Sequence, residues 1–273
     1  MQAETLRIAT YDAELSRKGP GLLLRDIRRG DDTQIIAALS VIAVVDADVI
    51  LLTRIDYDHG LVALGALADA LANAGRPYPY RFALRPNTGM STGLDLDGNG
   101  LLGDARDAQG YGRFAGQGGM AILSRLPIVT DAARDFSGFL WIDLPGALLP
   151  EGMSDTAKSV QRLSSTAHWE VPVALPDGTI LRLLAWHATP PVFDGPEDRN
   201  GKRNHDEAAF WLRLLAGDLP FRAPDPPFIL LGQAEMDPSD GDGLPDAIAA
   251  LLNHASLQDP SPAAVFAPPP KPG

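Results

Sequence analysis

FILLGQAEMDP, at residues 228–238, has the composition of a buried strand that ends in polar side chains. Its apolar residues run into Gly232, and Gln233, Glu235 and Asp237 follow at once. Ligands of layered α/β proteins bind at the edge where the carboxyl ends of strands meet. The stretch therefore predicts a sheet with a site at its end. Because an amide precedes the acid, this site departs from an ordinary acidic metal site.

Three further segments have the apolar runs and β-branched residues of strands, and each ends in polar side chains. They are residues 6–15, residues 48–56 and a hairpin over residues 167–188. The polar residues at their ends are Asp12, Arg54, Asp56 and His187. A single polar strand end is typical of a solvated boundary, but several of them in one chain favour a common site.

Helices are predicted between the strands, at residues 32–47, 61–75, 205–219 and 246–255. Asp32 is a candidate N-cap, and Gly75 is placed to end its helix. The first 75 residues alternate strand and helix, which predicts an α/β fold whose first strands are parallel neighbours. Residues 119–129 add another strand. We expect one domain over residues 1–260, followed by a disordered proline-rich tail at 261–273.

Composition narrows the function classes. The chain of 273 residues has no cysteine, so disulfides and thiolate metal sites are excluded and hard cations are favoured. A net charge of −12 makes nucleic acid an unlikely partner, and no apolar run is long enough to cross a membrane. The first residues of the sequence, MQAETLRIAT, leave two locations open. The protein is either secreted or periplasmic after removal of a signal peptide, or cytoplasmic. The oligomeric state is undetermined.

Residues 86–119 are a long insertion rich in glycine and aspartate, and loops of this length usually carry a function or an ion. Within it, DLDGNG at 95–100 has the spacing that opens a calcium loop, with Asp95, Asp97 and Asn99 as candidate ligands. The twelfth position is Arg106 instead of Glu, so Asp104 and Asp107 are both candidates for the missing carboxylate. A solvated glycine-rich turn is the alternative. DPSDGDG at 237–243 is a weaker version of the motif.

The chain resembles the endonuclease/exonuclease/phosphatase superfamily, which includes DNase I-like enzymes. Matching stretches appear in the family's order: IATYDAELS, DVILLTRID, GGMAILSRLPIV, LLAWHATPP and ILLGQAEMDP. A bacterial subgroup with loops like PNTG, LDLDGNG and TPPVFDGPEDRNG looks most similar. The resemblance implies a four-layer sandwich of two mixed β-sheets flanked by helices. It also implies phosphoester hydrolysis with Mg²⁺ or Mn²⁺.

Several residues depart from the pattern that the resemblance implies. Asp12 stands where the family has Asn, and Arg54 stands where it has a metal-binding Glu. A guanidinium cannot ligate a cation. Gln233 replaces an Asp and Glu235 an Asn, whereas His187 is retained. The family's closing Asp-His pair has no counterpart in this sequence.

Two arrangements of the site follow from these departures. In one, Arg54 neutralises phosphate in place of the metal, with His187, Gln233 and Glu235 as the remaining catalytic set. In the other, a shifted ion site uses these acids: Asp12, Asp56, Glu235 and Asp237.

A segment of mixed charge follows His187, at residues 190–207. Arg199, Arg203 and His205 are candidate anion-binding residues. In the alternative, Asp206 and Glu207 occupy the first turn of the next helix, where acids favour the macrodipole. His168 and the tryptophans Trp141, Trp169 and Trp211 are expected to be structural.

Three functions remain open. The first is a metal-dependent phosphoesterase or phosphodiesterase of weak or altered activity. The second is an inactive relative that binds a small phosphorylated or anionic ligand. The third is a calcium-stabilised extracellular scaffold.

Overall fold

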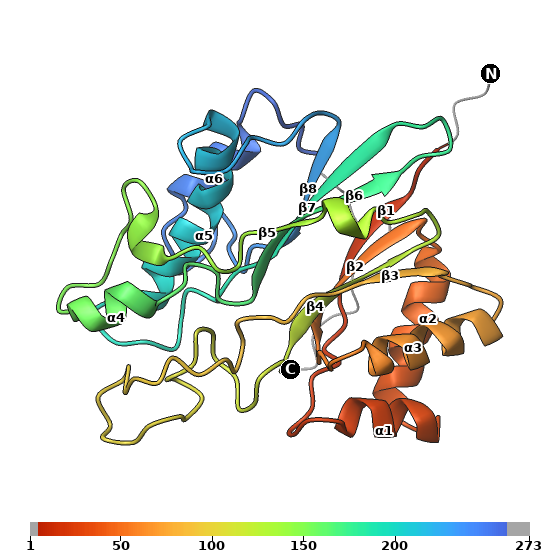
Figure 1. Cartoon of the computed structure of the whole chain (residues 1–273), viewed down its shortest axis with the longest axis horizontal. Helices are drawn as coiled ribbons and strands as arrows, with labels where there is room; N and C mark the ends of the chain where they lie inside the picture. Colours follow the sequence, from red (N-terminus) through yellow and green to blue (C-terminus); the bar gives the residue numbers. More distant parts are fainter. Residues whose placement is uncertain (1–4, 261–273) are drawn as a thin grey trace.

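A computed structural model describes residues 5–260, and it consists of two four-stranded sheets packed face to face with helices on both outer sides (Figure 1). This is the predicted four-layer α/β sandwich with mixed sheets. The predicted tail at 261–273 lies outside the described residues.

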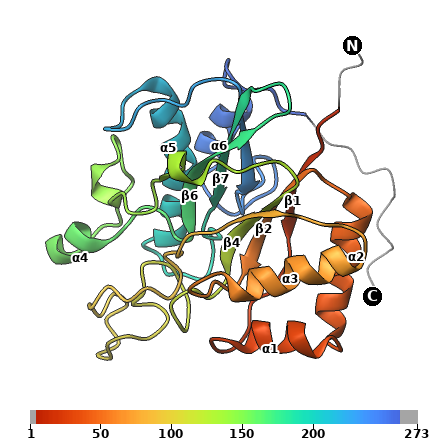
Figure 2. The same cartoon turned by 45° about the vertical axis from the view of Figure 1, so that its right-hand side comes forward.

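The first sheet has the order β1-β2-β4-β3. Its strands are β1 (Ile8–Asp12), β2 (Val49–Ile55), β3 (Tyr80–Phe82) and β4 (Gly119–Ser124). β1 and β2 are parallel, as predicted, whereas β4 is antiparallel to both β2 and β3. The helices on its outer side are α1 (Leu22–Arg29), α2 (Thr33–Val45) and α3 (Val62–Asn73) (Figure 2). Asp32 caps α2 by accepting a hydrogen bond from the Ile35 amide at 2.9 Å.

The second sheet has the order β5-β6-β7-β8. Its strands are β5 (Arg134–Asp135), β6 (Ala167–Ala174), β7 (Ile180–His187) and β8 (Phe228–Gln233). β6 and β7 form the predicted antiparallel hairpin, and β8 runs parallel to β7. The helices of this half are α4 (Asp155–Val160), α5 (Arg199–Ala216) and α6 (Asp246–Leu252), with short 3-10 turns at Thr130–Ala132 and Trp141–Asp143.

Alternation along each strand divides the apolar side chains among three cores. In β2, Ile50 and Leu52 face α1–α3, whereas Val49 and Leu51 face the second sheet. In β6, Trp169 also lies in the core between the sheets. Leu184 of β7 packs outward, in the core that contains α5 and α6. The structure confirms the structural role expected of Trp141, Trp169 and Trp211, since all three are fully buried.

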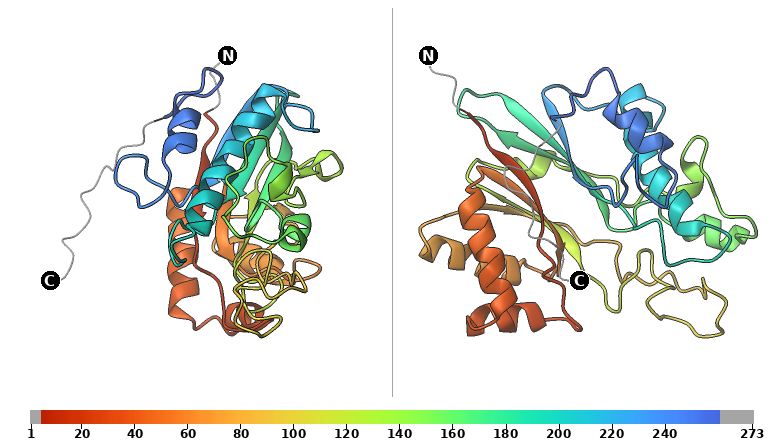
Figure 3. Two further views of the ribbon diagram at one scale, coloured as in Figure 1. Left: turned by 90° about the vertical axis from the view of Figure 1, so that its left-hand side faces the viewer. Right: turned by 180° about the vertical axis from the view of Figure 1, so that it is seen from behind.

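β1 and β8 come from opposite ends of the chain, yet they are in contact, and β8 also contacts β2 (Figure 3). β1 and β2 are parallel, and so are β7 and β8. Because β8 contacts β1 and β2, the carboxyl ends of these two strand pairs lie together. The fold thereby collects the polar strand ends that were predicted to form a site.

Helix α5 begins at Arg199, one and a half turns before the predicted start at residue 205. Its first residues are polar, so the apolar periodicity that located the helix begins too late. The alternative that placed Asp206 and Glu207 in the first turn of this helix is therefore wrong, because both lie well inside the helix and are fully buried. α1 and α4 were not predicted.

The 86–119 segment contains β-bridges in place of long strands, Thr88 to Gly110 and Ser91 to Ala108. Gly110 lies so close to the 161–165 segment that an added Cβ would be 1.8 Å from the Ser165 carbonyl oxygen. The segment is thus an ordered loop held against the second half of the molecule. No helix among residues 5–260 is long and apolar enough to span a membrane.

Candidate functional site

Five polar residues meet at the carboxyl ends of β1, β2, β7 and β8, and we call them the strand-end cluster: Asp12, Arg54, His187, Gln233 and Glu235. Four of them belong to strands, and Glu235 follows β8 directly. A continuous series of polar contacts links the five. The sequence prediction that these strand ends converge is therefore correct.

Arg54 and Asp12 form the centre of the cluster. The guanidinium donates through Nε to Asp12 Oδ1 at 2.7 Å, and a terminal nitrogen donates to Oδ2 in a second, very close contact. Burial alone would raise the pKa of the Asp12 carboxyl, but the bonds from Arg54 and Gln233 together lower it. The same hydrogen bond raises the pKa of the Arg54 guanidinium. The pair is therefore fully ionised at neutral pH.

The Gln233 amide is oriented by its partners. Thr53 Oγ donates to Gln233 Oε1 at 2.7 Å, which directs the amide nitrogen toward the two carboxylates. Gln233 Nε2 donates to Asp12 Oδ2 at 3.2 Å and to Glu235 Oε1 at 2.6 Å. The amide thus presents N–H groups, and not its oxygen, to the acids of the cluster.

His187 is almost completely buried, and its Nε2 lies 3.4 Å from Glu235 Oε1. In the tautomer with the proton on Nε2, this contact is a hydrogen bond to the carboxylate. Nδ1 is buried and has no hydrogen-bond partner among residues 5–260. A histidine–carboxylate pair therefore exists, but the far side of the ring is unsupported.

Backbone geometry places two of these side chains in an unusual conformation. Arg54 and Glu235 both have φ of 53°, in the left-handed region that non-glycine residues adopt rarely. The β2–β4 register shifts between Thr53 and Ile55, so Arg54 lies at a β-bulge, a feature that re-aims a side chain. Strained backbone of this kind concentrates at functional sites.

Two acids predicted to complete an ion site do not reach the cluster. Asp56 accepts hydrogen bonds from the amides of Arg17 (2.8 Å) and Gly118 (2.9 Å), so it fastens loops together. Burial raises the pKa of its carboxyl. Asp237 accepts from the Ser239 amide at 2.7 Å in a local turn. In this structure the four acids Asp12, Asp56, Glu235 and Asp237 are therefore not gathered into one group that could hold an ion.

The residues that remain do not fit Mg²⁺ or Mn²⁺ at the strand ends. Both Asp12 oxygens accept from Arg54, and the Gln233 N–H groups face Asp12 and Glu235. A cation placed there would meet the guanidinium and the amide donors, because both Asp12 oxygens and Glu235 Oε1 already accept from them. As paired in this structure, the cluster presents an ion pair at the positions where the family resemblance implies metal ligands.

The proposed anion-binding cluster after His187 has a different role in the structure. Arg203 is buried, and it donates to the carbonyls of Leu163 (2.8 Å), Arg162 (2.8 Å) and Gln109 (2.6 Å). Arg199 donates to Gln161 Oε1 at 2.6 Å. Both arginines hold α5 to the 161–165 segment, and Arg203 also holds it to Gln109 of the 86–119 loop.

His205 Nδ1 lies 2.9 Å from Asp206 Oδ1, and Asp206 also accepts from the Trp141 indole. It belongs to the packing of α5 and not to the strand-end cluster. Two partners of the cluster were missed: Thr53, which orients Gln233, and Glu14, whose Oε1 lies 3.5 Å from Arg54. Thr53 directly precedes Arg54, and this adjacency was the only signal that the sequence offered.

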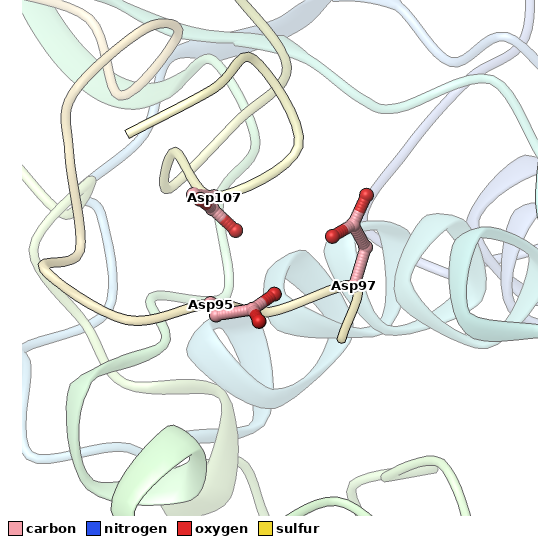
Figure 4. A group of neighbouring side chains, drawn as sticks. All are labelled: Asp95, Asp97 and Asp107. Carbon is pink, nitrogen blue, oxygen red and sulfur yellow. The ribbon is translucent and has the colours of Figure 1, made fainter. Parts of the chain in front are cut away.

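The 86–119 loop brings together a second group of acids, Asp95, Asp97 and Asp107, with one ligand oxygen of each within 4.8 Å of the others (Figure 4). Asp107 is fully buried and comes from the returning part of the loop. Asn99 points instead to the Asp97 and Asp104 carboxylates. Of the two candidates for the missing carboxylate, Asp107 therefore joins the group.

Two packed mixed sheets, outer helices and polar strand ends define an α/β sandwich with a phosphoesterase-type fold. A family model described as the endonuclease/exonuclease/phosphatase family matches residues 23–256. The chain belongs to this family. No curated protein sequence matches it.

Solved structures share the architecture at low identity. An endonuclease/exonuclease/phosphatase from Beutenbergia cavernae DSM 12333 is 15% identical, with a TM-score of 0.51 over 91% of this chain and 53% of that one. Sphingomyelinase C from Streptomyces griseocarneus is 18% identical, with a TM-score of 0.49 over 92% and 70%. A mutant beta toxin from Staphylococcus aureus, solved with bound magnesium ions, is 14% identical, with a TM-score of 0.47 over 94% and 72%.

Proposed function

We propose that this chain binds a small phosphorylated ligand at the strand-end cluster, through Arg54 in place of a divalent cation, and hydrolyses phosphoesters weakly or not at all. The observation that carries this proposal is the Arg54–Asp12 ion pair. It puts a permanent positive charge where the family resemblance expects a metal-binding carboxylate. A guanidinium pairs with phosphate as readily as with a carboxylate.

Arg54 keeps binding capacity after pairing with Asp12. The contacts of its guanidinium involve Nε and one terminal nitrogen, and its other terminal nitrogen has no partner among residues 5–260. The side chain is 41% exposed, so a ligand has access to these N–H groups.

The surrounding charge limits the affinity. Asp12, Glu14 and Glu235 all raise the pKa of Arg54, so three carboxylates surround one guanidinium. A phosphate group is repelled by these acids, and we expect a dissociation constant on the order of 1 mM.

The same residues explain weak hydrolysis. Metal-assisted phosphoester hydrolysis needs a cation to neutralise phosphate and a base to activate water. Gln233 cannot act as a base, and Glu235 is held by the Gln233 amide and His187.

A thermal-shift assay with inorganic phosphate in EDTA tests the binding. We expect phosphate to raise the melting temperature of the wild type but not of Arg54→Ala. Arg29→Ala is the matched control, because Arg29 is also an exposed arginine paired with an aspartate, on α1. Equal phosphate shifts in the wild type and Arg54→Ala contradict the proposal.

Hydrolysis of bis-p-nitrophenyl phosphate with Mn²⁺ or Mg²⁺, and with EDTA as a control, tests the catalytic part. We expect no EDTA-sensitive turnover in the wild type. The triple variant Arg54→Glu, Gln233→Asp and Glu235→Asn is the positive arm, since it restores at these positions the Glu, Asp and Asn that the family resemblance implies. Robust EDTA-sensitive turnover by the wild type overturns this part of the proposal.

A second function is favoured by the acidic group of the 86–119 loop. We propose that Asp95, Asp97 and Asp107 hold Ca²⁺ and that the ion stabilises this loop. Their oxygens have the mutual spacing that a cation requires, and two of them come from the DLDGNG motif. Oxygen-only ligands suit a hard ion.

A further inference from the structure

A cavity of about 370 Å³ lies on the outer face of the second sheet, well away from the strand-end cluster. Ile180 and Arg182 line it at the start of β7, whereas His187 ends the same strand. The five residue steps from Arg182 to His187 correspond to roughly 17 Å along a strand. The cavity is therefore a separate site, and its size is in the range of small-molecule pockets.

Incomplete covering of the sheet explains the cavity. Helix α5 packs on this face through Phe210 and Trp211, against Leu184 and Trp186 near the end of β7. Arg182 lies on the same face, two residues before Leu184, because alternate residues of a strand share a face. There the segment that precedes β8 forms one wall in place of the helix, with Arg222, Ala223 and Asp225.

The cavity has an apolar part and a cationic part. The apolar lining residues are Val129, Ala132, Pro172, Ile180 and Ala223. The charged lining residues are Arg134, Arg182, Arg222, Glu170 and Asp225. Three arginines against two acids leave one positive charge, in a chain whose net charge is −12. This combination suits a ligand with one negative charge on an apolar body.

Ion pairs fix the arginines in place. Glu170 is only 4% exposed, and both Arg134 and Arg182 pair with it, the latter at 3.3 Å from Nε to Oε1. Arg182 also pairs with Asp225 at 3.3 Å, and Asp225 in turn pairs with Arg222. A buried carboxylate shared by two guanidinia gives a pre-organised cationic wall.

Free donors remain at the mouth of the cavity. Arg222 is 77% exposed, and its contacts with residues 5–260 use a single terminal nitrogen, on Asp225. The N–H groups on its other nitrogens have no partner in this part of the chain. They are the groups from which an incoming carboxylate can accept charged hydrogen bonds.

We propose that this cavity binds a small monocarboxylate with an aliphatic tail, with its carboxylate on Arg222 and its tail on the apolar lining. Charge selects a single anionic group, and the apolar lining selects a ligand longer than acetate. Neither feature involves the strand-end cluster, so this binding is independent of phosphate binding there.

Isothermal titration of the full chain with octanoate tests the proposal, with acetate and octylammonium as comparison probes. We expect octanoate to bind with a dissociation constant of roughly 1 mM or tighter, and the other two probes to give no measurable binding. Arg222→Gln should weaken octanoate binding by about tenfold or more, because it removes a charged hydrogen bond. Arg29→Gln, on α1, and Arg54→Ala should leave it unchanged.

Arg222→Gln is expected to fold normally because Arg222 is exposed, and its circular dichroism spectrum checks this. Ile180→Asn tests the apolar part, and it should weaken octanoate binding while the melting temperature is followed in parallel. The proposal is overturned if octanoate does not bind, if octylammonium binds equally well, or if folded Arg222→Gln binds octanoate as tightly as the wild type.

Discussion

Replacing Arg203 by Met tests the structural role that separates this arginine from a ligand-binding one. Its guanidinium makes three hydrogen bonds of 2.6 to 2.8 Å to buried backbone carbonyls. Bonds from a charged donor contribute roughly 1.5–3 kcal/mol each, or about 5–9 kcal/mol together. Methionine replaces the aliphatic stem of the side chain but has no donor and does not reach the guanidinium position, so the carbonyls would be left unpaired.

Desolvation offsets part of this sum. Burial lowers the pKa of Arg203 from 12.5 to about 10. A shift of this size corresponds to roughly 3 kcal/mol of cost for the charged form, which the variant no longer bears. The expected loss is therefore about 2–6 kcal/mol, which lowers the melting temperature by roughly 5–15 °C in a domain of this size.

Urea unfolding followed by circular dichroism measures the loss. Arg213→Met is the matched control on the same helix, because Arg213 is half-exposed and its only ion pair within residues 5–260 is with the exposed Asp218. It should change the unfolding free energy by less than about 1 kcal/mol. If Arg203→Met unfolds like the wild type but no longer binds phosphate, Arg203 is a ligand contact and its structural assignment is wrong.

Three further predictions concern the loop, the core and β8. Millimolar Ca²⁺ should raise the melting temperature of the wild type and of Asp240→Asn, but not of Asp95→Asn; an equal shift in all three contradicts the loop site. His168 is fully buried and its pKa is lowered to about 4, so the unfolded chain is protonated first as pH falls. Urea unfolding should thus show on the order of 3 kcal/mol of stability lost between pH 6.5 and pH 4, and His168→Gln should lack this loss. An alanine Cβ at Gly232 would lie 2.0 Å from the Trp186 carbonyl oxygen, so Gly232→Ala should displace Gln233 and abolish the phosphate-induced thermal shift; an unchanged shift contradicts this geometry.

Apolar patterning was sufficient for most of the architecture. The apolar run at 48–56 forms β2, which is buried between the outer helices and the second sheet. The run at 228–232 forms β8, which is partly buried at the edge of the second sheet. Apolar patterning failed at the start of α5, where Gly201 and Asn204 are buried although the local pattern is polar. There the tertiary hydrogen bonds of Arg203, and not apolar periodicity, stabilise the helix.

The site was predicted in part. Convergence of Asp12, Arg54, His187 and Gln233 follows from parallel strand ends, which residue order reveals. The partner of each side chain does not follow, because it depends on register and on the β-bulge at Arg54. Asp56 illustrates this limit: it is two residues from Arg54 in sequence, but the bulge and its loop bonds turn it away from the cluster.

We propose that the Arg54 guanidinium, and not a divalent cation, receives phosphate at the strand ends. The most direct measurement is the phosphate-induced change in melting temperature of wild type and Arg54→Ala, each with EDTA and with Mn²⁺. We expect a shift in the wild type that is the same in EDTA and Mn²⁺ and is absent from Arg54→Ala. A shift that requires Mn²⁺, or that survives in Arg54→Ala, contradicts it.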